Sequence, residues 1–370
     1  NSIQLIGIND AFWNFALLEA DKPPSLSDGE VLINRRLAKQ LGLGAGKKFR
    51  LRIAKPSVLP RDAPLSVAED LTMRLSLTVA KVTSKQSELA NFSLRPGAVE
   101  PYNVFVPLSW LQDKADLPGR ANVMLAGDMS PNGVSNLVQA ANALLKDKWQ
   151  LADAELELRT IATNHFIELR TDRIFLDEHA LKAATTSESY TTLTYIANEL
   201  RMGTNATPYS MITGVQTAQF PNAPKDDEML ITEWLAKDLS AKVGDNIDVA
   251  YYVLGLNRQL EELRHTFNVT GIVPTEEPGW RELMPNFPGI VDKDNIRDWN
   301  PGIDFNSTRI QNQDEDYWKQ HRGTPKAFIA LETGQTLWGN RYGEATAVRY
   351  KFTEGKSKEI EASLRKEFDP

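Results

Sequence analysis

Two stretches of the chain share one pattern of apolar and polar positions. Residues 27–53 and 225–251 align without a gap at a constant offset of 198, the difference between Glu228 and Glu30. A repeat at a fixed offset indicates a duplicated structural unit and takes precedence over the assignment of single elements. The pattern therefore predicts an internally duplicated chain. The positions of the first stretch that recur unchanged are Glu30, Leu32, Ile33, Leu37, Ala38, Lys39, Leu41 and Gly46.

Each stretch predicts a strand, a short helix, a tight turn and a second strand. The run at 30–33 is apolar and branched enough for a strand, and Asn34 and Thr232 are favoured N-cap types for the helix that follows. Glycines at 42–46 end the helix and turn the chain. Apolar and charged residues then alternate over 49–53, which fits a half-buried strand.

The helix of each stretch presents one apolar face. Leu37 and Leu41 lie four residues apart, so their side chains share a face. Leu235 and Leu239 repeat this spacing in the second stretch. We expect all four leucines to lie in the core.

Similarity between the two halves continues downstream in looser register. It predicts a first repeat over residues 1–155 and a second repeat over residues 208–370. The expected fold class is α+β, built from internally duplicated mixed α/β units. The matching segments are 75–82 with 265–272, 104–108 with 327–331, 122–125 with 346–349, and a predicted helix at 134–145 with one at 356–368.

A structured connection is predicted between the repeats, over residues 156–207. Its pattern indicates a strand at 166–169, a helix at 176–184 and a strand at 190–196, which is a β-α-β arrangement. Residues 201–208 contain Gly, Asn, Thr and Pro and give the strongest loop signal of the chain. We expect the boundary to the second repeat there.

The second repeat carries a long insertion, residues 276–323, rich in Pro, Gly, Asp and Trp. Insertions of this length are usually functional or disordered, and its aromatic content predicts order, because disordered segments are poor in aromatic residues. One interpretation is a compact loop whose rings pack on their own domain. The other is a partner surface, since Trp and Tyr dominate binding hot spots. The candidate surface residues are Trp280, Phe287, Trp299, Tyr317 and Trp318.

Composition narrows the function classes. The net charge of −7 disfavours nucleic acid as a partner, and no stretch approaches the ~20 apolar residues of a membrane span. The chain has no cysteine, which excludes disulfides and thiolate chemistry. It starts at Asn1 without a signal peptide, and we expect it to be part of a larger protein.

The sequence offers no motif for catalysis, cofactor binding or metal binding. His165, His179, His265 and His321 form no metal-ligand spacing, and neither a hydrolase elbow nor a phosphate loop is present. The acidic residues of the insertion fail the EF-hand pattern, because Ile296 stands at a ligand position. We therefore expect no catalytic residues, no cofactor and no metal site.

Several segments resemble a known family. Residues 7–12, 29–48 and 267–273 fit the patterns G-[IV]-x-x-x-F, G-E-x-x-[IL]-x-x-x-L-A-x-x-L-G-x-x-x-G and F-x-V-x-G-I-V. These resemble the periplasmic core domain of MacB-like, FtsX-type ABC-transporter permeases. That domain is a single unit, whereas this chain is doubled and enlarged. Further segments resemble the large extracytoplasmic domain of long bacterial FtsX-like permeases, namely 284–289, 298–302, 314–318 and 324–328.

The resemblance implies a non-enzymatic role in transport. In such permeases a cytoplasmic ATPase drives motion of the extracytoplasmic domain, and lipoproteins, lipids, peptides or drugs are exported. It implies a cell-membrane protein with this domain in the periplasm and transmembrane helices flanking Asn1 and Pro370. The implied partners are the rest of the permease, the ATPase subunit, and a periplasmic adaptor or exported substrate. The alternative is a secreted binding protein or enzyme that uses the Trp-rich insertion as its site.

Overall fold

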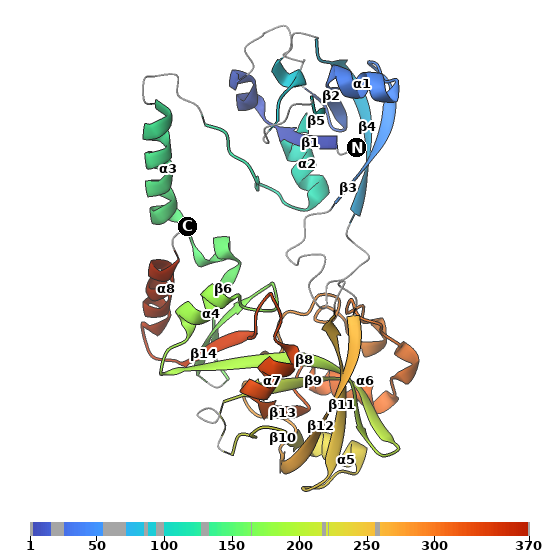
Figure 1. Ribbon diagram of the computed structural model, residues 1–370, viewed down its shortest axis with the longest axis vertical. Helices are drawn as coiled ribbons and strands as arrows, with labels where there is room; N and C mark the ends of the chain where they lie inside the picture. The colour runs from blue at the N-terminus through green and yellow to red at the C-terminus, as the bar shows by residue number, and fades with distance from the viewer. Residues whose placement is uncertain are drawn as a thin grey trace. The chain divides into compact units, whose positions relative to one another are not determined.

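The chain folds into two compact units in a computed structural model. The structure describes residues 3–15, 26–54, 72–84, 88–93, 100–126, 133–163, 165–216, 220, 222–255 and 260–368. Unit 1 comprises Asn1–Ser57 and Glu69–Gly127, and unit 2 comprises Val58–Ala68 and Asp128–Pro370. The fold is mixed α+β, as predicted, with eight α-helices and two sheets in the described part (Figure 1).

Unit 1 is an open half-barrel. β1 runs parallel to β5 and β2 runs parallel to β4, whereas the pairs β5–β2 and β4–β3 are antiparallel. Helix α1 follows β2 and helix α2 follows β5. The strands in spatial order are β1 (Ile3–Ile8), β5 (Tyr102–Pro107), β2 (Glu30–Ile33), β4 (Thr72–Val82) and β3 (Lys48–Ala54), and the helices are α1 (Arg35–Leu41), α2 (Leu108–Ala115) and the 3-10 helices η1 (Asp10–Phe15) and η3 (Glu88–Ala90).

Unit 2 contains a closed barrel. Its strands in spatial order are β8 (Ser189–Met202), β9 (Asn205–Val215), β13 (Ala327–Ala330), β10 (Glu228–Thr232), β12 (Leu260–Val273) and β11 (Asn246–Leu254). The barrel closes because β11 also pairs with β8, from Asp248 opposite Arg201 to Ala250 opposite Glu199. Beyond β8 the sheet continues through β14 (Ala347–Lys351), β7 (Phe166–Thr171) and β6 (Leu156–Ile161).

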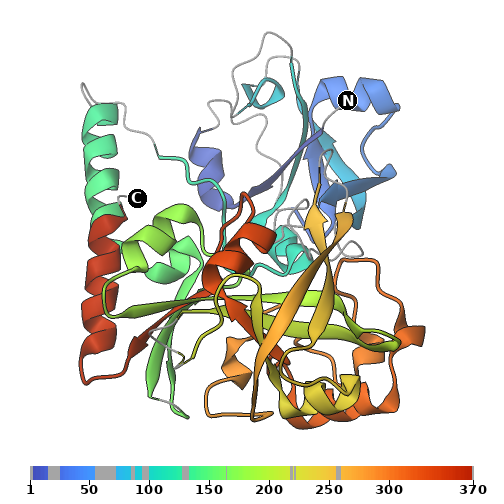
Figure 2. The same ribbon diagram turned by 60° about the horizontal axis from the view of Figure 1, so that its bottom comes forward.

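Helices cover the extended part of the unit 2 sheet. Helices α4 and α8 lie side by side (Figure 2) and share a core with β7 and β14 that includes Ala180, Leu169, Val348 and Leu364. The α-helices of unit 2 are α3 (Gly133–Lys148), α4 (Glu178–Ala184), α5 (Glu233–Leu239), α6 (Asn312–His321), α7 (Leu331–Trp338) and α8 (Lys356–Glu367), and the 3-10 helix η4 (Leu151–Ala154) precedes β6.

One strand order and one register occur in both units. The series β9-β13-β10-β12-β11 has the order and the neighbour orientations of β1-β5-β2-β4-β3. The register shifts between Val31 and Leu32 on β2, and at the same place, between Met229 and Leu230, on β10. The turn before the antiparallel edge strand also recurs, because Gly46 N donates to Val79 O and Gly244 N donates to Val269 O, each at 2.7 Å.

The predicted helix caps are confirmed. The Asn34 side chain accepts from Leu37 N at 3.2 Å, and the Thr232 hydroxyl accepts from Leu235 N at 3.3 Å. Each bond satisfies an amide that the first turn of a helix leaves without a backbone partner. Gly42, with φ +64°, closes helix α1 as predicted.

The four helix leucines do not behave alike. Leu37, Leu235 and Leu239 are buried, as predicted, but Leu41 is 48% exposed, so that expectation is wrong. Leu239 lies against the start of β9, where the Asn205 side chain donates to its carbonyl oxygen at 2.9 Å. Leu41 has no such cover among the described residues, because β1 begins only at Ile3.

The strand, helix and strand predicted within the connection are present as β7, α4 and β8, and all three belong to unit 2. The loop expected at 201–208 is wrong. Strands β8 and β9 form a hairpin that pairs Met202 directly with Asn205, leaving a two-residue turn in which Gly203 has φ +57°. Glycine supplies positive φ in hairpin turns at no steric cost, so this signal marked a tight turn rather than a boundary.

Candidate functional site

The insertion of residues 276–323 is described throughout and forms short helices. It packs on the barrel of unit 2 and contributes Phe287, Ile290 and Ile310 to the same core as β8 and β9. Its elements are η6 (Arg281–Leu283), η7 (Ile296–Asp298), η8 (Ser307–Arg309) and α6. The insertion is thus an ordered, integral part of the unit 2 fold.

Most of the aromatic residues expected to form a partner surface lie in the core instead. Phe287, Trp299, Tyr317 and Trp318 are each at most 5% exposed, so they offer no surface. Trp280 is partly exposed and stacks on Phe220, with ring centroids 5.6 Å apart. The compact-loop interpretation fits these side chains, because burial of large rings stabilises a long insertion.

Hydrogen bonds fix the buried rings. Trp318 Nε1 donates to Lys293 O at 3.0 Å, and Tyr317 Oη donates to Thr324 O at 3.0 Å. Trp299 meets Trp318 edge to face at 4.7 Å. The polar end of a buried ring is usually hydrogen-bonded, and the backbone carbonyls of Lys293 and Thr324 provide the partners for Trp318 and Tyr317.

A buried lysine holds helix α6 against the barrel. Lys326 stands just before β13, with its ammonium 4.2 Å from the Trp234 ring centroid and 4.7 Å from that of Tyr317. The Asp314 carboxylate lies 3.7 Å away and also accepts from Gln311 N at 2.9 Å. Burial lowers the pKa of Lys326 to about 8, although Asp314 opposes the shift, and burial raises the pKa of Asp314.

A second buried ion pair holds the start of the insertion. Arg349 on β14 and Glu168 on β7 are both 2% exposed, and Arg349 Nε donates to Glu168 Oε2 at 2.6 Å. Arg349 Nη1 also donates to Gly279 O at 3.0 Å. From β6, Arg159 bonds the other oxygen of Glu168 and donates to Glu282 O at 3.1 Å. The insertion is therefore tied to the sheet at the Gly279 and Glu282 carbonyls.

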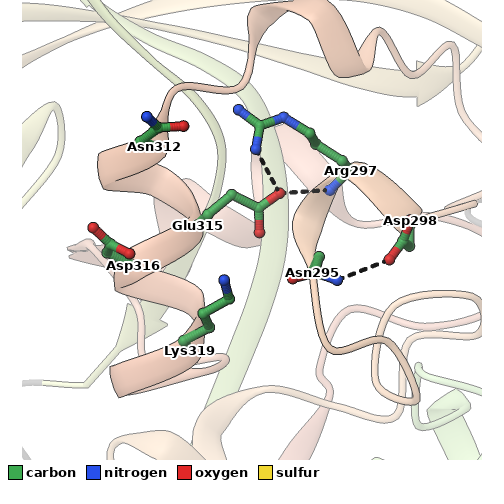
Figure 3. Close-up of a pocket in the computed structure, with 7 residues that line it drawn as sticks. All are labelled: Asn295, Arg297, Asp298, Asn312, Glu315, Asp316 and Lys319. Carbon is green, nitrogen blue, oxygen red and sulfur yellow. Dashed lines mark hydrogen bonds and ion pairs between the residues drawn. The ribbon is translucent and has the colours of Figure 1, made fainter.

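The insertion also carries a surface cleft of about 500 Å³ (Figure 3). Three of its lining residues come from η7 and its border and four from helix α6. The lining residues are Asn295, Arg297, Asp298, Asn312, Glu315, Asp316 and Lys319. They carry both signs of charge, which suits a polar ligand with cationic and anionic groups.

Some charged side chains of the cleft are hydrogen-bonded within the protein, and others are free to contact a ligand. Glu315 is buried and projects toward Arg297 (Figure 3), accepting from Ile296 N at 2.9 Å and from Arg297 N at 3.1 Å. It therefore fixes η7 to α6. Asp316 and Lys319 make no hydrogen bond or ion pair within the described part of the chain. These two side chains are available to a ligand.

The acidic residues of the insertion are engaged separately rather than around one point. Asp294 pairs with Arg322 at 3.0 Å and Asp292 with Lys293 at 3.0 Å. Among the described residues, no group of three or more acidic or histidine side chains could hold a metal ion. Ion pairs with Lys293 and Arg322 thus engage two of these acidic residues, Asp292 and Asp294.

Two histidine–carboxylate pairs were not evident from the sequence. His265 Nε2 lies 2.8 Å from Asp227 Oδ1, and His321 Nδ1 lies 3.0 Å from Glu276 Oε2. The partners are 38 and 45 residues apart along the chain, so no local motif could show them. Neither pair borders the cleft.

Comparison with known proteins adds no assignment. No protein-family model matches the chain, and no characterised protein matches its sequence significantly. Within the described residues, none of the helices is long and apolar enough to cross a membrane.

Proposed function

We propose that the chain is a non-enzymatic extracytoplasmic domain of a bacterial ABC-transporter permease of the MacB-like, FtsX type. Each of its two units contains a copy of one ancestral five-strand module, and the units couple motion driven by a cytoplasmic ATPase to export of a substrate or handling of a lipoprotein or lipid. The single observation that carries the proposal is the strand register common to both units, with its shared register shift after Val31 and Met229. The family-like segments 7–12, 29–48 and 267–273 each include part of the strand series that recurs in the two units.

The first glycine of the family-like pattern supports the proposal. A Cβ on Gly7 would lie 3.0 Å from Leu108 Cδ1, and a Cβ on Gly214, at the matching place in β9, would lie 3.2 Å from Leu331 Cα. Leu108 and Leu331 are the first residues of helices α2 and α7. The glycine thus lets the helix lie close to the strand in both units, so the resemblance reflects packing and not a catalytic site.

The attachment of the insertion supports a transmission role. Arg349 with Glu168 and Lys326 with Asp314 tie its two ends to the sheet through buried charges. Removing one partner of such a pair leaves an uncompensated buried charge and is strongly unfavourable. The insertion is therefore anchored firmly to the barrel, as a module that passes on a mechanical displacement requires.

Labelling of single cysteines tests the location. The chain of residues 1–370 has no cysteine, so Val243→Cys, at a side chain that is 60% exposed, creates one reactive site in this part of the protein, and any cysteine elsewhere in the full-length protein is first replaced by serine. In spheroplasts that express the natural full-length protein, a membrane-impermeant maleimide is expected to label it without lysis. Ala241→Cys, two residues away and buried, is the matched control and is expected to stay unlabelled. Labelling of Val243→Cys only after lysis would contradict the proposal.

Co-purification tests the partner. A tagged full-length protein is expected to retain an ATPase subunit in detergent. The ATPase activity of this complex is expected to change when a chemical cross-link prevents motion of the extracytoplasmic domain. Purification as a single soluble species from the culture medium would exclude a permease.

The cleft beside helix α6 favours a second candidate function, a secreted binding protein with its site on the insertion. Its volume of about 500 Å³ and the available Asp316 and Lys319 are the supporting observation. Under this alternative, Lys319→Ala weakens binding of a zwitterionic peptide, whereas Lys358→Ala, at an exposed site on helix α8, leaves binding unchanged. Calorimetry with a mixed-charge peptide pool distinguishes the two functions.

A further inference from the structure

Both edges of the unit 1 half-barrel lack a neighbouring strand in the described part of the chain. There β1 pairs only with β5, and β3 pairs only with β4. Their counterparts in unit 2, β9 and β11, both pair with the single strand β8, which runs antiparallel to each of them. Unit 1 therefore has the frame of the closed barrel with one strand position open.

The open strand position changes the burial of the neighbouring side chains, as a comparison of β3 with β11 shows. On β3, Phe49, Leu51 and Ile53 are only partly buried, although they pack on the unit 1 core. Their counterparts at an offset of 198 are Ile247, Val249 and Tyr251, which are at most 3% exposed. The apolar positions are thus retained in unit 1 without the cover that completes their burial.

The opposite edge shows the same difference. Leu5 on β1 is partly buried, whereas Ile212, at the matching place on β9, is fully buried. Leu41 and Leu239 differ in the same direction. Exposed strand edges beside apolar side chains are a template for another strand, so both edges favour occupation by extended polypeptide.

We propose that unit 1 accepts one β-strand between β1 and β3, antiparallel to both, and that the same polypeptide supplies it on the N-terminal side of β1. The source follows from the connection in unit 2, where β8 leads into β9 through a two-residue turn after Met202. A two-residue turn is the shortest hairpin connection and places consecutive strands side by side. This inference is independent of transport.

Charge specifies the chemistry of the incoming strand. Arg50 and Arg52 are exposed on β3, and Leu51 lies between them. In unit 2 the corresponding β11 residues are paired with Arg201, Leu200 and Glu199. Opposite charges directly across an antiparallel pair stabilise it. The strand therefore carries acidic residues opposite Arg50 and Arg52 and an apolar residue opposite Leu51.

An extended chain tests acceptance of the strand. A copy of residues 189–207 carrying Arg201→Glu is placed directly before Asn1, since Ile3 corresponds to Ser210 at an offset of 207. We expect hydrogen exchange of the β1 and β3 amides to slow at least ~10-fold, because new cross-strand bonds protect them. A matched extension with Ala197→Pro and Glu199→Pro, which removes ladder donors, is expected to give no protection.

Disulfide mapping tests the register in the same chain. Arg50→Cys is combined with a cysteine at position 201 of the copy, or one residue out of register at position 200. Directly paired residues lie within disulfide reach, whereas a one-residue slip turns the side chain to the other face. A disulfide in the first combination alone supports the proposal. Equal yields, or unchanged exchange of β1 and β3 while unit 2 stays protected, overturn the strand acceptor.

The natural polypeptide tests the source of the strand. We expect β1 and β3 to be protected when the residues that naturally precede Asn1 are included, relative to the chain of residues 1–370. If β1 and β3 exchange at the same rate in both, or become protected only on addition of a separate peptide of residues 189–202, the N-terminal source is wrong.

Discussion

Units 1 and 2 share a strand order and a register, yet only one of them is a closed barrel. In unit 2, strand β8 joins β9 to β11, and the side chains beneath it are buried. In unit 1 the corresponding edges of β1 and β3 lack a described neighbour, and Leu41 is exposed. Turns and caps, which depend on neighbouring residues, accompany the register that the two units share. The burial of the edge side chains depends instead on whether a strand such as β8 lies beside them.

The extended sheet of unit 2 gives the largest expected effect. Arg349→Leu leaves Glu168 buried with Arg159 alone, and we expect a loss of ~3–5 kcal/mol in the free energy of unfolding. The matched variant Arg170→Leu breaks the pair with Glu157, which is 54% exposed, and should cost at most ~1 kcal/mol. Urea unfolding of both variants measures this contrast. Equal losses in the free energy of unfolding would show that the burial of an ion pair does not determine its contribution to stability.

Matched leucines test the effect of closure on the core. Leu239→Ala creates a cavity in a fully buried site and should cost ~2–5 kcal/mol. Leu41→Ala, at the corresponding position of unit 1, should change stability by no more than ~1 kcal/mol, because the side chain is already half in water. Chemical denaturation followed by probes in each unit separates the two. A large loss for Leu41→Ala would contradict the open frame of unit 1.

Lys326 gives a pH-dependent contrast with its counterpart in unit 1. At an offset of 223 that counterpart is Asn103, which donates to Phe92 O at 2.8 Å and carries no charge. Because the pKa of Lys326 falls from 10.5 to about 8 on folding, the folded state binds fewer protons than the unfolded state between these values. The free energy of unfolding therefore rises with pH across that window.

The reference for this pH effect is the double variant Lys326→Met with Asp314→Asn. We expect the wild type to gain ~1–3 kcal/mol relative to it between pH 8 and pH 10. Melts at closely spaced pH values measure the difference, and a constant difference would show that Lys326 keeps its proton.

The N-caps give the smallest contrast. Thr232→Ala should cost ~1 kcal/mol, because it removes one bond to the first turn of α5. Asn34→Ala should cost more, since its amide also donates to Ala90 O at 3.0 Å and Pro101 O at 2.7 Å. The ranking is read from thermal unfolding, and a greater loss for Thr232→Ala would reverse it.

The sequence predicted the features that depend on neighbouring residues. Asn34 and Thr232 were identified as caps because their chemistry acts within one helical turn. Leu41 was misplaced because its burial depends on a strand that i, i+4 spacing does not report. The turn at Gly203 was read as a boundary, since glycine signals positive φ without stating whether paired strands continue on both sides.

The candidate site was less predictable. Composition marked the insertion as ordered, but Trp299 and Trp318 serve the core, and aromatic content alone does not separate packing from recognition. The Glu168–Arg349 pair spans 181 residues, so no local pattern in the sequence indicates it. The burial of Lys326 is likewise not visible in its neighbours along the chain. Burial of these charges arises from the assembled sheet.

The two units share one strand order, and within the described residues only unit 2 is closed into a barrel, by β8. Residue-resolved hydrogen exchange of the chain tests this central claim most directly. We predict slow exchange for the paired amides of β2, β4 and β5, as for β10, β12 and β13. We predict fast exchange for the outward amides of β1 and β3, and slow exchange for those of β9 and β11, which bond to β8. Equal protection of the edge strands in both units would contradict the account.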